Sequence, residues 1–297
     1  MMTLIFTACQ REEVPDLEEG VPSEEEYEEE LNEGGIDTKE QSFPFDESQN
    51  DPLNPNADFD TRQFQLVGGP ERDVREPRPV SNNLLQQLFP DTLVLKGDSN
   101  TNQVALTFDD GPDVRFTPQV LDVLEKHDVK ATFFLVGTRA NEHRDLVQRI
   151  HDSGHAIGNH TYWHPNLPKE EVDRLHWELT ETENVLADIL GYQPRLFRAP
   201  YGALNEEMLY MLTDLDFTVV GWDVDSLDWK QLEPELIQDN VLSNVSFGSI
   251  ILMHDGGDWT MDLSGTADAL DEIITKLKED GTEFVTVPEL FGIPEAK

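Results

Sequence analysis

Short apolar runs alternate with segments of helical periodicity from about residue 85 to the end of the chain. Seven runs predict strands: Val104–Phe108, Ala131–Val136, Ala156–Asn159, Leu196–Ala199, Thr218–Trp222, Ser249–Met253 and Glu283–Val287. Segments with apolar residues every three or four positions predict helices over 117–127, 139–152, 169–190, 205–214, 234–245 and 264–280. Because strands separated by helices form parallel βαβ units, we expect an α/β domain, either a barrel or an open doubly wound sheet.

A β-hairpin is predicted at the start of this domain. Thr92–Lys96 and Gln103–Asp109 both have strand-like composition, and the turn-forming residues Gly97–Asn100 lie between them. We therefore expect these two strands to pair as antiparallel neighbours.

The region before the domain has a different composition. Residues 10–60 contain 19 Asp and Glu against 2 Lys and Arg, with few large apolar side chains. Such a segment buries too little apolar surface to offset the entropy of ordering. We interpret 10–84 as a disordered acidic linker and 85–297 as the folded domain. An isolated acidic helix around 24–33 is the alternative, but adjacent like charges weaken it.

Composition excludes several kinds of protein. The 297 residues include 61 Asp and Glu, 21 Lys and Arg and one Cys, for a formal charge of -40. Nucleic acid and polybasic membrane contacts are disfavoured, because both need clustered cations. A single Cys allows neither an intrachain disulfide nor a cysteine-based zinc site, so any metal must be held by His, Asp or Glu.

The first nine residues, Met1–Cys9, form a short apolar run that ends in the only cysteine. The run is too short to span a bilayer. Phe6–Cys9 resembles the end of a bacterial lipoprotein signal, although Leu is usual where Phe6 stands and no basic residues precede the run. We expect 1–9 to be a signal remnant and a lipid on Cys9 to be the membrane contact; an incidental apolar terminus is the alternative.

Polar residues gather where the predicted strands end. These are Asp109, Asp110, His160, Arg198, Asp225, Asp228 and His254. In parallel α/β folds the carboxyl ends of the strands form the rim at which active sites assemble. Spacing alone therefore predicts one site that contains acids, histidines and an arginine.

Two of these groups suggest a metal. Asp109 and Asp110 precede a Gly-Pro turn, and their side chains point to opposite sides of the strand. His160 and His164 have the i, i+4 spacing that aligns two imidazoles on a helical turn. Two histidines with one carboxylate make a standard catalytic zinc set. A solvated turn and two surface histidines are the plainer alternatives.

Two further rim residues have less specific signals. His254 ends a hydrophobic strand, where a capping or core histidine is common, but Asp225 or Asp228 nearby would keep it protonated as a general acid. Arg198 is either a surface charge or the partner of a rim carboxylate.

Five ordered motifs together resemble those of the polysaccharide deacetylase family, also called the NodB-homology domain or carbohydrate esterase family 4. They are Thr107–Pro112, His160–His164, Arg198–Tyr201, Asp225–Trp229 and Leu252–His254. The resemblance covers about residues 100–292. It implies a distorted (β/α)7-8 barrel of parallel strands and a divalent metal, commonly zinc and in some members cobalt or another transition ion.

By the same resemblance, Asp110, His160 and His164 are the metal ligands, Asp109 is the catalytic base and His254 is the general acid.

Supporting roles also follow from the matched positions. Arg198 would orient Asp109, and Asp228 would support His254, with Asp225 as the alternative. Tyr201 would supply a backbone N–H to the oxyanion, while Trp229 and Leu252 would contact the substrate.

The resemblance further implies a deacetylase that removes N-acetyl groups from N-acetylglucosamine in a cell-surface polysaccharide. Peptidoglycan is the leading substrate, and Tyr201 supports it, because members that act on N-acetylmuramic acid often have Arg there. Such a protein would act outside the cytoplasm. An O-acetyl esterase on xylan and a noncatalytic glycan-binding protein are the alternatives.

Overall fold

The computed structural model describes residues 82–297. The predicted signal remnant at 1–9 and nearly all of the predicted linker at 10–84 lie outside the described residues. The first described helix, α3 (Asn82–Leu88), begins within the last residues assigned to that linker and buries Leu85. Within 82–297, no helix has the length and apolar character needed to cross a membrane.

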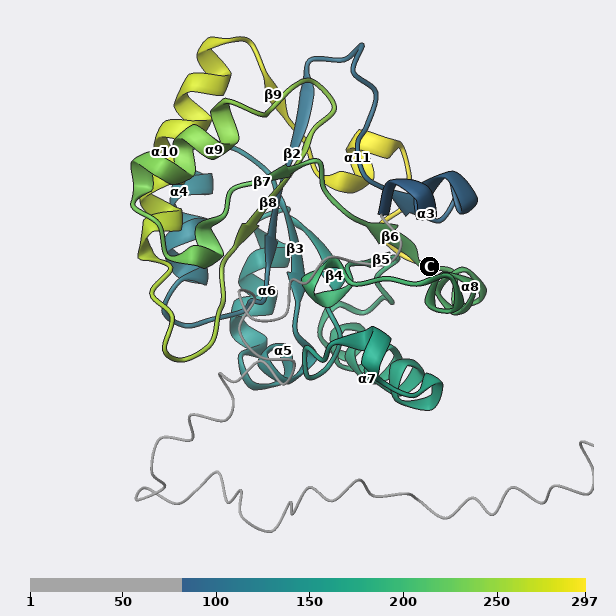
Figure 1. Ribbon diagram of the computed structural model, residues 1–297. Helices are drawn as coiled ribbons and strands as arrows, with labels where there is room; N and C mark the ends of the chain where they lie inside the picture. The colour runs from purple at the N-terminus through teal and green to yellow at the C-terminus, as the bar shows by residue number, and fades with distance from the viewer. Residues whose placement is uncertain (1–81) are drawn as a thin grey trace, which may run out of the picture. The chain divides into compact units, whose positions relative to one another are not determined.

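A curled parallel sheet forms the centre of the domain (Figure 1). Its strands follow the order β1-β6-β5-β4-β3-β2-β8-β7, and β9 pairs with β2. Their bounds are β1 Leu93–Val94, β2 Gln103–Asp109, β3 Thr132–Leu135, β4 Ala156–Asn159, β5 Leu196–Phe197, β6 Thr218–Val220, β7 Val224–Asp225, β8 Ile250–His254 and β9 Glu283–Phe284. The sheet is a half-barrel, which confirms the predicted α/β distorted barrel.

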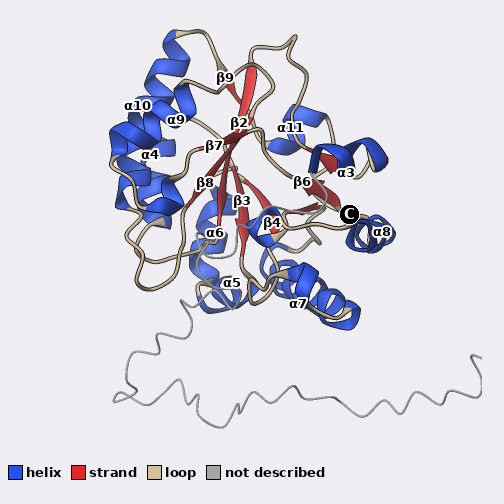
Figure 2. Cartoon of the chain, in the orientation of Figure 1, coloured by secondary structure: helices blue, strands red, loops and turns tan. Residues whose placement is uncertain are grey.

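Helices surround this sheet (Figure 2). Besides α3, the α-helices are α4 Thr117–His127, α5 Gly137–Glu142, α6 Arg144–Asp152, α7 Val172–Leu190, α8 Glu206–Asp214, α9 Pro234–Leu242, α10 Ser264–Glu279 and α11 Val287–Phe291. Three short 3-10 helices are η3 Leu167–Lys169, η4 Pro200–Gly202 and η5 Asp228–Lys230. All six predicted helical segments are helical, but the segment 139–152 is two helices that break at His143.

The strand predicted over 283–287 is only two residues long, because a helix begins directly after it. The Thr286 side chain accepts a hydrogen bond from the backbone N–H of Glu289, and the Glu289 carboxylate accepts one from the Thr286 N–H. This capping box, with Pro288 in the first turn, starts α11.

The predicted hairpin is wrong. Leu93–Val94 pairs in parallel with Val219–Val220 of β6. Strands β6, β5, β4 and β3 lie between it and β2, the strand with which it was predicted to pair. The reason is burial, since Leu93 packs into a core cluster with Leu85, Leu209 and Leu212. Apolar contacts with α3 and α8 therefore outweigh the local turn signal of Gly97–Asn100.

Candidate active site

The carboxyl ends of the strands bring the predicted rim residues together. Asp109 ends β2 beside His254, which ends β8, and the two are register partners. Asp110, His160 and Arg198 follow on the loops after β2, β4 and β5. Each of these five residues is buried, at most 4% exposed. So many buried ionisable groups require partners, because an unpaired buried charge is costly.

Asp110, His160 and His164 form a compact triad. One ligand atom from each lies within 4.8 Å of the others. Asp110 Oδ1 is 3.2 Å from His160 Nε2 and 3.0 Å from His164 Nε2, yet this buried oxygen accepts no well-formed hydrogen bond. An oxygen and two imidazole nitrogens that converge in this way fit a divalent metal ion.

The two histidines reach this position by an irregular backbone, not by the helical turn that their spacing predicted. Thr161 and His164 have φ of 66° and 56°, in the left-handed region. Glu178 of α7 accepts hydrogen bonds of 2.7 Å from the N–H groups of both Tyr162 and Trp163. Glu178 thereby fixes the segment between the two histidines.

The Nδ1 atom of each histidine, on the side of the ring away from the triad, also has a hydrogen-bond partner. His160 Nδ1 donates to the Arg198 carbonyl at 2.8 Å, and His164 Nδ1 lies 3.1 Å from the Tyr201 hydroxyl. A bound Nδ1–H leaves the Nε2 lone pair directed at the triad, as metal-binding histidines require.

The charges of the triad are coupled. Burial alone would raise the pKa of Asp110, but His164 and His160 outweigh it and hold that pKa well below its usual value. Burial would lower the pKa of His160, but Asp109 and Asp110 outweigh it and raise that pKa. The site therefore favours positive charge between these side chains, whether a proton or a metal ion.

Arg198 is a buried partner of Asp109 and not a surface charge. Its Nη1 donates to Asp109 Oδ1 at 2.7 Å and to Thr107 Oγ1 at 2.8 Å. Its Nε donates to the Val220 carbonyl at 3.0 Å, and its guanidinium stacks 4.2 Å from the Phe134 ring centroid. The second carboxylate oxygen of Asp109 faces the triad, 3.8 Å from His160 Nε2.

His254 pairs with Asp228, not with Asp225. Asp228 Oδ1 is 2.7 Å from His254 Nδ1, and Oδ2 accepts from the His254 N–H at 2.8 Å and from Thr266 Oγ1 at 2.9 Å. Burial would raise the pKa of Asp228, but His254 and these hydrogen bonds outweigh it and lower that pKa. Asp225 instead accepts from the Trp229 indole at 3.3 Å.

The three predicted substrate residues lie in the same region but are enclosed. Tyr201, in η4, has φ of 59° and is 3% exposed, with its hydroxyl on His164. Trp229 is 7% exposed and Leu252 is fully buried in β8. The Tyr201 side chain therefore supports a triad histidine, which its sequence position did not indicate.

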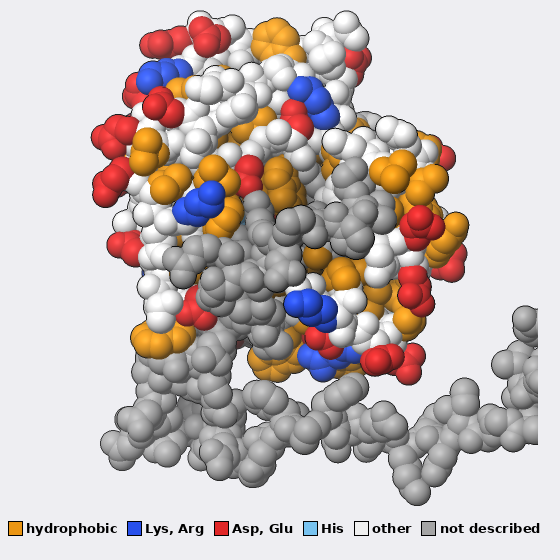
Figure 3. All heavy atoms as spheres, viewed as in Figure 1, with side chains coloured by type: hydrophobic (Ala, Val, Ile, Leu, Met, Phe, Trp, Pro, Cys, Tyr) orange, Lys and Arg blue, Asp and Glu red, His pale blue; other side chains and the backbone are white. Residues whose placement is uncertain are grey.

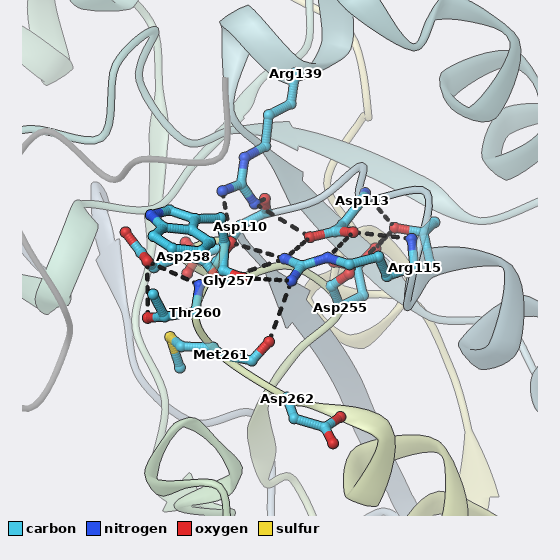
Figure 4. A network of polar contacts seen from close by, with 12 residues as sticks. Asp110, Asp113, Arg115, Arg139, Asp255, Gly257, Asp258, Thr260, Met261 and Asp262 are labelled. Carbon is cyan, nitrogen blue, oxygen red and sulfur yellow. Dashed lines mark hydrogen bonds and ion pairs between the residues drawn. The ribbon is translucent and has the colours of Figure 1, made fainter. Parts of the chain in front are cut away.

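A buried charged cluster next to the triad was not predicted (Figure 4). It contains the buried residues Asp113, Thr117, Arg139 and Asp255, together with the partly exposed Arg115. Burial is the main cause that raises the pKa of Asp255 to about 7, with the Asp113 carboxylate also raising it. Asp113 and Asp255 directly follow two of the motifs, so their sequence positions could have indicated that they lie near the site. Nothing in the sequence distinguishes Arg139 or Glu178 from other charged residues of the predicted helical segments.

Comparison with known proteins agrees with this geometry. A polysaccharide deacetylase family model matches residues 96–220. A peptidoglycan-N-acetylglucosamine deacetylase of Bacillus cereus is 48% identical over 197 residues, which are 66% of this chain and 70% of the relative. The corresponding enzyme PgdA of Listeria monocytogenes is 39% identical over 65% of this chain and 40% of its own length.

A solved structure shows the same fold. The crystal structure of the peptidoglycan N-acetylglucosamine deacetylase Bc1960 superposes with a TM-score of 0.69 at 43% identity, over 72% of this chain and 99% of that one. The fold and the buried triad define an α/β protein with a hydrolase-type metal site. The chain belongs to the polysaccharide deacetylase family.

Proposed function

We propose that this protein is a metal-dependent deacetylase that removes N-acetyl groups from N-acetylglucosamine residues of peptidoglycan. The observation that carries the proposal is the pairing of a buried Asp-His-His triad with the Arg198–Asp109 and Asp228–His254 pairs at one rim. Relatives at 39–48% identity, named as peptidoglycan deacetylases, support this substrate.

Asp110, His160 and His164 would hold the metal, with zinc as the proposed ion and cobalt or another transition ion as the alternative. Such an ion, when bound, polarises a carbonyl and acidifies water toward a pKa of ~7. Asp109 acts as the base that takes the proton from the attacking water. Arg198 occupies Asp109 Oδ1, so the oxygen that faces the triad is the one available to that proton.

His254 is proposed as the general acid. Asp228 holds the His254 Nδ1–H, so the imidazole presents Nε2 to the scissile amide. A proton from this nitrogen makes the sugar amine a competent leaving group. The backbone N–H of Tyr201 is the proposed donor to the oxyanion, and Trp229 and Leu252 are proposed to shape the acetyl pocket.

The substrate sets the proposed location. Peptidoglycan lies outside the cytoplasmic membrane, so the protein would act there, with the proposed lipid on Cys9 as its membrane contact. Figure 3 shows more acidic than basic side chains on the visible face of the domain, and the full chain has a formal charge of -40. Such a surface is not suited to polyanionic partners such as nucleic acid.

Acetate release tests the proposal. The full chain, stripped of metal, is assayed on purified peptidoglycan and on N-acetylglucosamine oligomers, alone and with zinc or cobalt. We expect release that depends on metal and is abolished in His160→Ala, while the surface variant Arg149→Met retains it. Release only from acetylated xylan would instead assign an O-acetyl esterase, and glycan binding without release would assign a noncatalytic binding protein.

A further inference from the structure

Three successive carbonyl oxygens at the end of β2 are held by three different parts of the fold. The Asp109 oxygen accepts from the Asp255 N–H at 3.1 Å, and the Gly111 oxygen accepts from the Val136 N–H at 2.9 Å. The Asp110 oxygen accepts from Arg139 Nη1 at 2.6 Å. Only the bond to Asp110 comes from a side chain, so of the three it alone depends on a residue's identity.

The peptide that Arg139 holds has an uncommon conformation. Asp110 has φ of 71°, in the left-handed region, which is strained for a residue with a Cβ. This backbone turn sends the Asp109 carboxylate toward Arg198 and the Asp110 carboxylate toward the two histidines. The direction of both carboxylates therefore depends on what stabilises the turn.

Arg139 is itself rigidly placed (Figure 4). It is 2% exposed, and its Nη2 donates to the Gly257 carbonyl at 2.8 Å. The backbone of Gly256 closes the same space, because a Cβ there would lie 2.4 Å from the Asp110 oxygen and 2.7 Å from Arg139 Nη1. One guanidinium thus links the loop after β2 to the loop after β8.

Simple charge pairing does not explain this placement. The Asp113 carboxylate is 4.0 Å from Arg139 Nη1, much farther than the Asp110 carbonyl, and Asp113 already binds Arg115 at 2.7 Å. Two short contacts of Arg139 are instead to main-chain oxygens, one on each of two loops. A planar guanidinium spans two such acceptors, whereas a lysine ammonium has a single nitrogen.

We propose that Arg139 is a positioning residue for the metal site: it holds the Asp110 peptide so that the Asp109 and Asp110 carboxylates keep their separate directions. Metal affinity and turnover then both depend on residue 139, although it is expected to touch neither metal nor substrate. Only the part about turnover rests on the proposed deacetylase function.

The first test measures metal binding without any substrate. Metal-stripped full-length protein, Arg139→Met and Arg139→Lys are titrated with Zn²⁺ in competition with a chelator, and the visible spectrum is recorded with Co²⁺. We expect zinc affinity to fall about 10–100-fold in Arg139→Met, the usual effect of removing a residue that orients a ligand. Arg139→Lys should lie between this variant and the parent, with an altered cobalt spectrum in both.

Arg149→Met is the matched control, because it also removes an arginine, one on α6 whose side chain is 39% exposed and pairs with Asp122. Its zinc affinity and cobalt spectrum should equal those of the parent. At saturating metal, Arg139→Met should lower kcat at least tenfold and leave KM within twofold of the parent. The reason is that the direction of the Asp109 carboxylate changes, whereas the contacts with the glycan do not.

A folded Arg139→Met protein with parental zinc affinity and kcat would overturn the proposal, even if its melting temperature fell, because the role would then be purely structural. If Arg139→Met does not fold, Arg139→Lys decides: parental affinity and spectrum in that variant equally overturn the proposal. A parent that binds zinc but releases no acetate would contradict the proposed function, and the titration would still test Arg139.

Discussion

Strand β4 has a histidine next to each of its ends, and the two have opposite properties although both are buried. His155, before the strand, is 5% exposed, and its Nδ1 accepts from the Ala131 N–H at 3.2 Å. Burial, with Lys130 as a lesser cause, lowers its pKa from 6.5 to about 4. His160, after the strand, is 2% exposed and has a raised pKa.

Burial alone therefore does not decide the charge of a buried histidine in this protein. The amino end of β4 supplies a backbone donor and a neighbouring lysine, which favour a neutral ring. The carboxyl end supplies Asp109 and Asp110, which favour a cation and outweigh desolvation. A parallel sheet creates this difference, because the rim loops converge at one end of the strands.

The largest effect is expected from the carboxylates that distinguish the rim. Asp109→Asn removes the proposed base but leaves the three metal ligands in place. We expect kcat for acetate release to fall about 10³-fold, within the usual range for general base catalysis. Zinc affinity, measured by chelator competition, should stay within a few-fold of the parent. Activity within tenfold of the parent would remove Asp109 from its assigned role.

At the amino end of β4, His155 should make the free energy of unfolding depend on pH. His155 is neutral in the folded protein and gains a proton on unfolding below pH 6.5, so its contribution is complete above pH 6.5 and is lost as pH falls toward 4. A shift from 6.5 to about 4 corresponds to about 3 kcal/mol.

His155→Asn tests this linkage, because an asparagine Oδ1 can accept the Ala131 N–H but does not titrate in this range. Urea unfolding of both proteins at pH 7 and pH 4 gives the comparison. The free energy of unfolding of the parent should fall by about 3 kcal/mol more than that of the variant. Parallel pH profiles would show that His155 does not behave as a neutral buried ring.

A smaller effect is expected from Glu178, which fixes the segment between the rim histidines. Glu178→Ala leaves the N–H groups of Tyr162 and Trp163 without their acceptor. Zinc affinity should fall about tenfold. Glu178→Gln is the control, because its amide oxygen still accepts both bonds and should retain most of the affinity. Equal affinities in the two variants would contradict the role of these bonds.

The smallest effect is expected away from both ends of the strand. Arg149 pairs with Asp122 at 2.6 Å, with side chains 39% and 69% exposed. Because solvent screens exposed ion pairs, Arg149→Met should change the free energy of unfolding by less than about 1 kcal/mol. A larger loss in urea unfolding would mean that surface charge matters more in this acidic protein than burial suggests.

Much of the fold could be predicted because its signals are local and repeated. The buried strands β2, β3, β4 and β8 read as continuous apolar runs, and six helical segments carried apolar periodicity. Two of the errors fall on two-residue strands, β1 and β9. Leu93–Val94 joins β6 because of contacts with α3 and α8, which no local pattern contains.

The sequence by itself determined which chemistry could occur, because the acids, histidines and arginine occupy strand ends that any parallel α/β fold brings to one rim. It left open whether Asp225 or Asp228 would meet His254, and it did not reveal Glu178 or Arg139. Those contacts were decided by the tertiary structure, through the left-handed turns and helix packing that place groups 15 to 29 residues apart within hydrogen-bonding distance. Sequence patterns record which side chains are available, whereas the exact partner depends on loop geometry that only the packed fold defines.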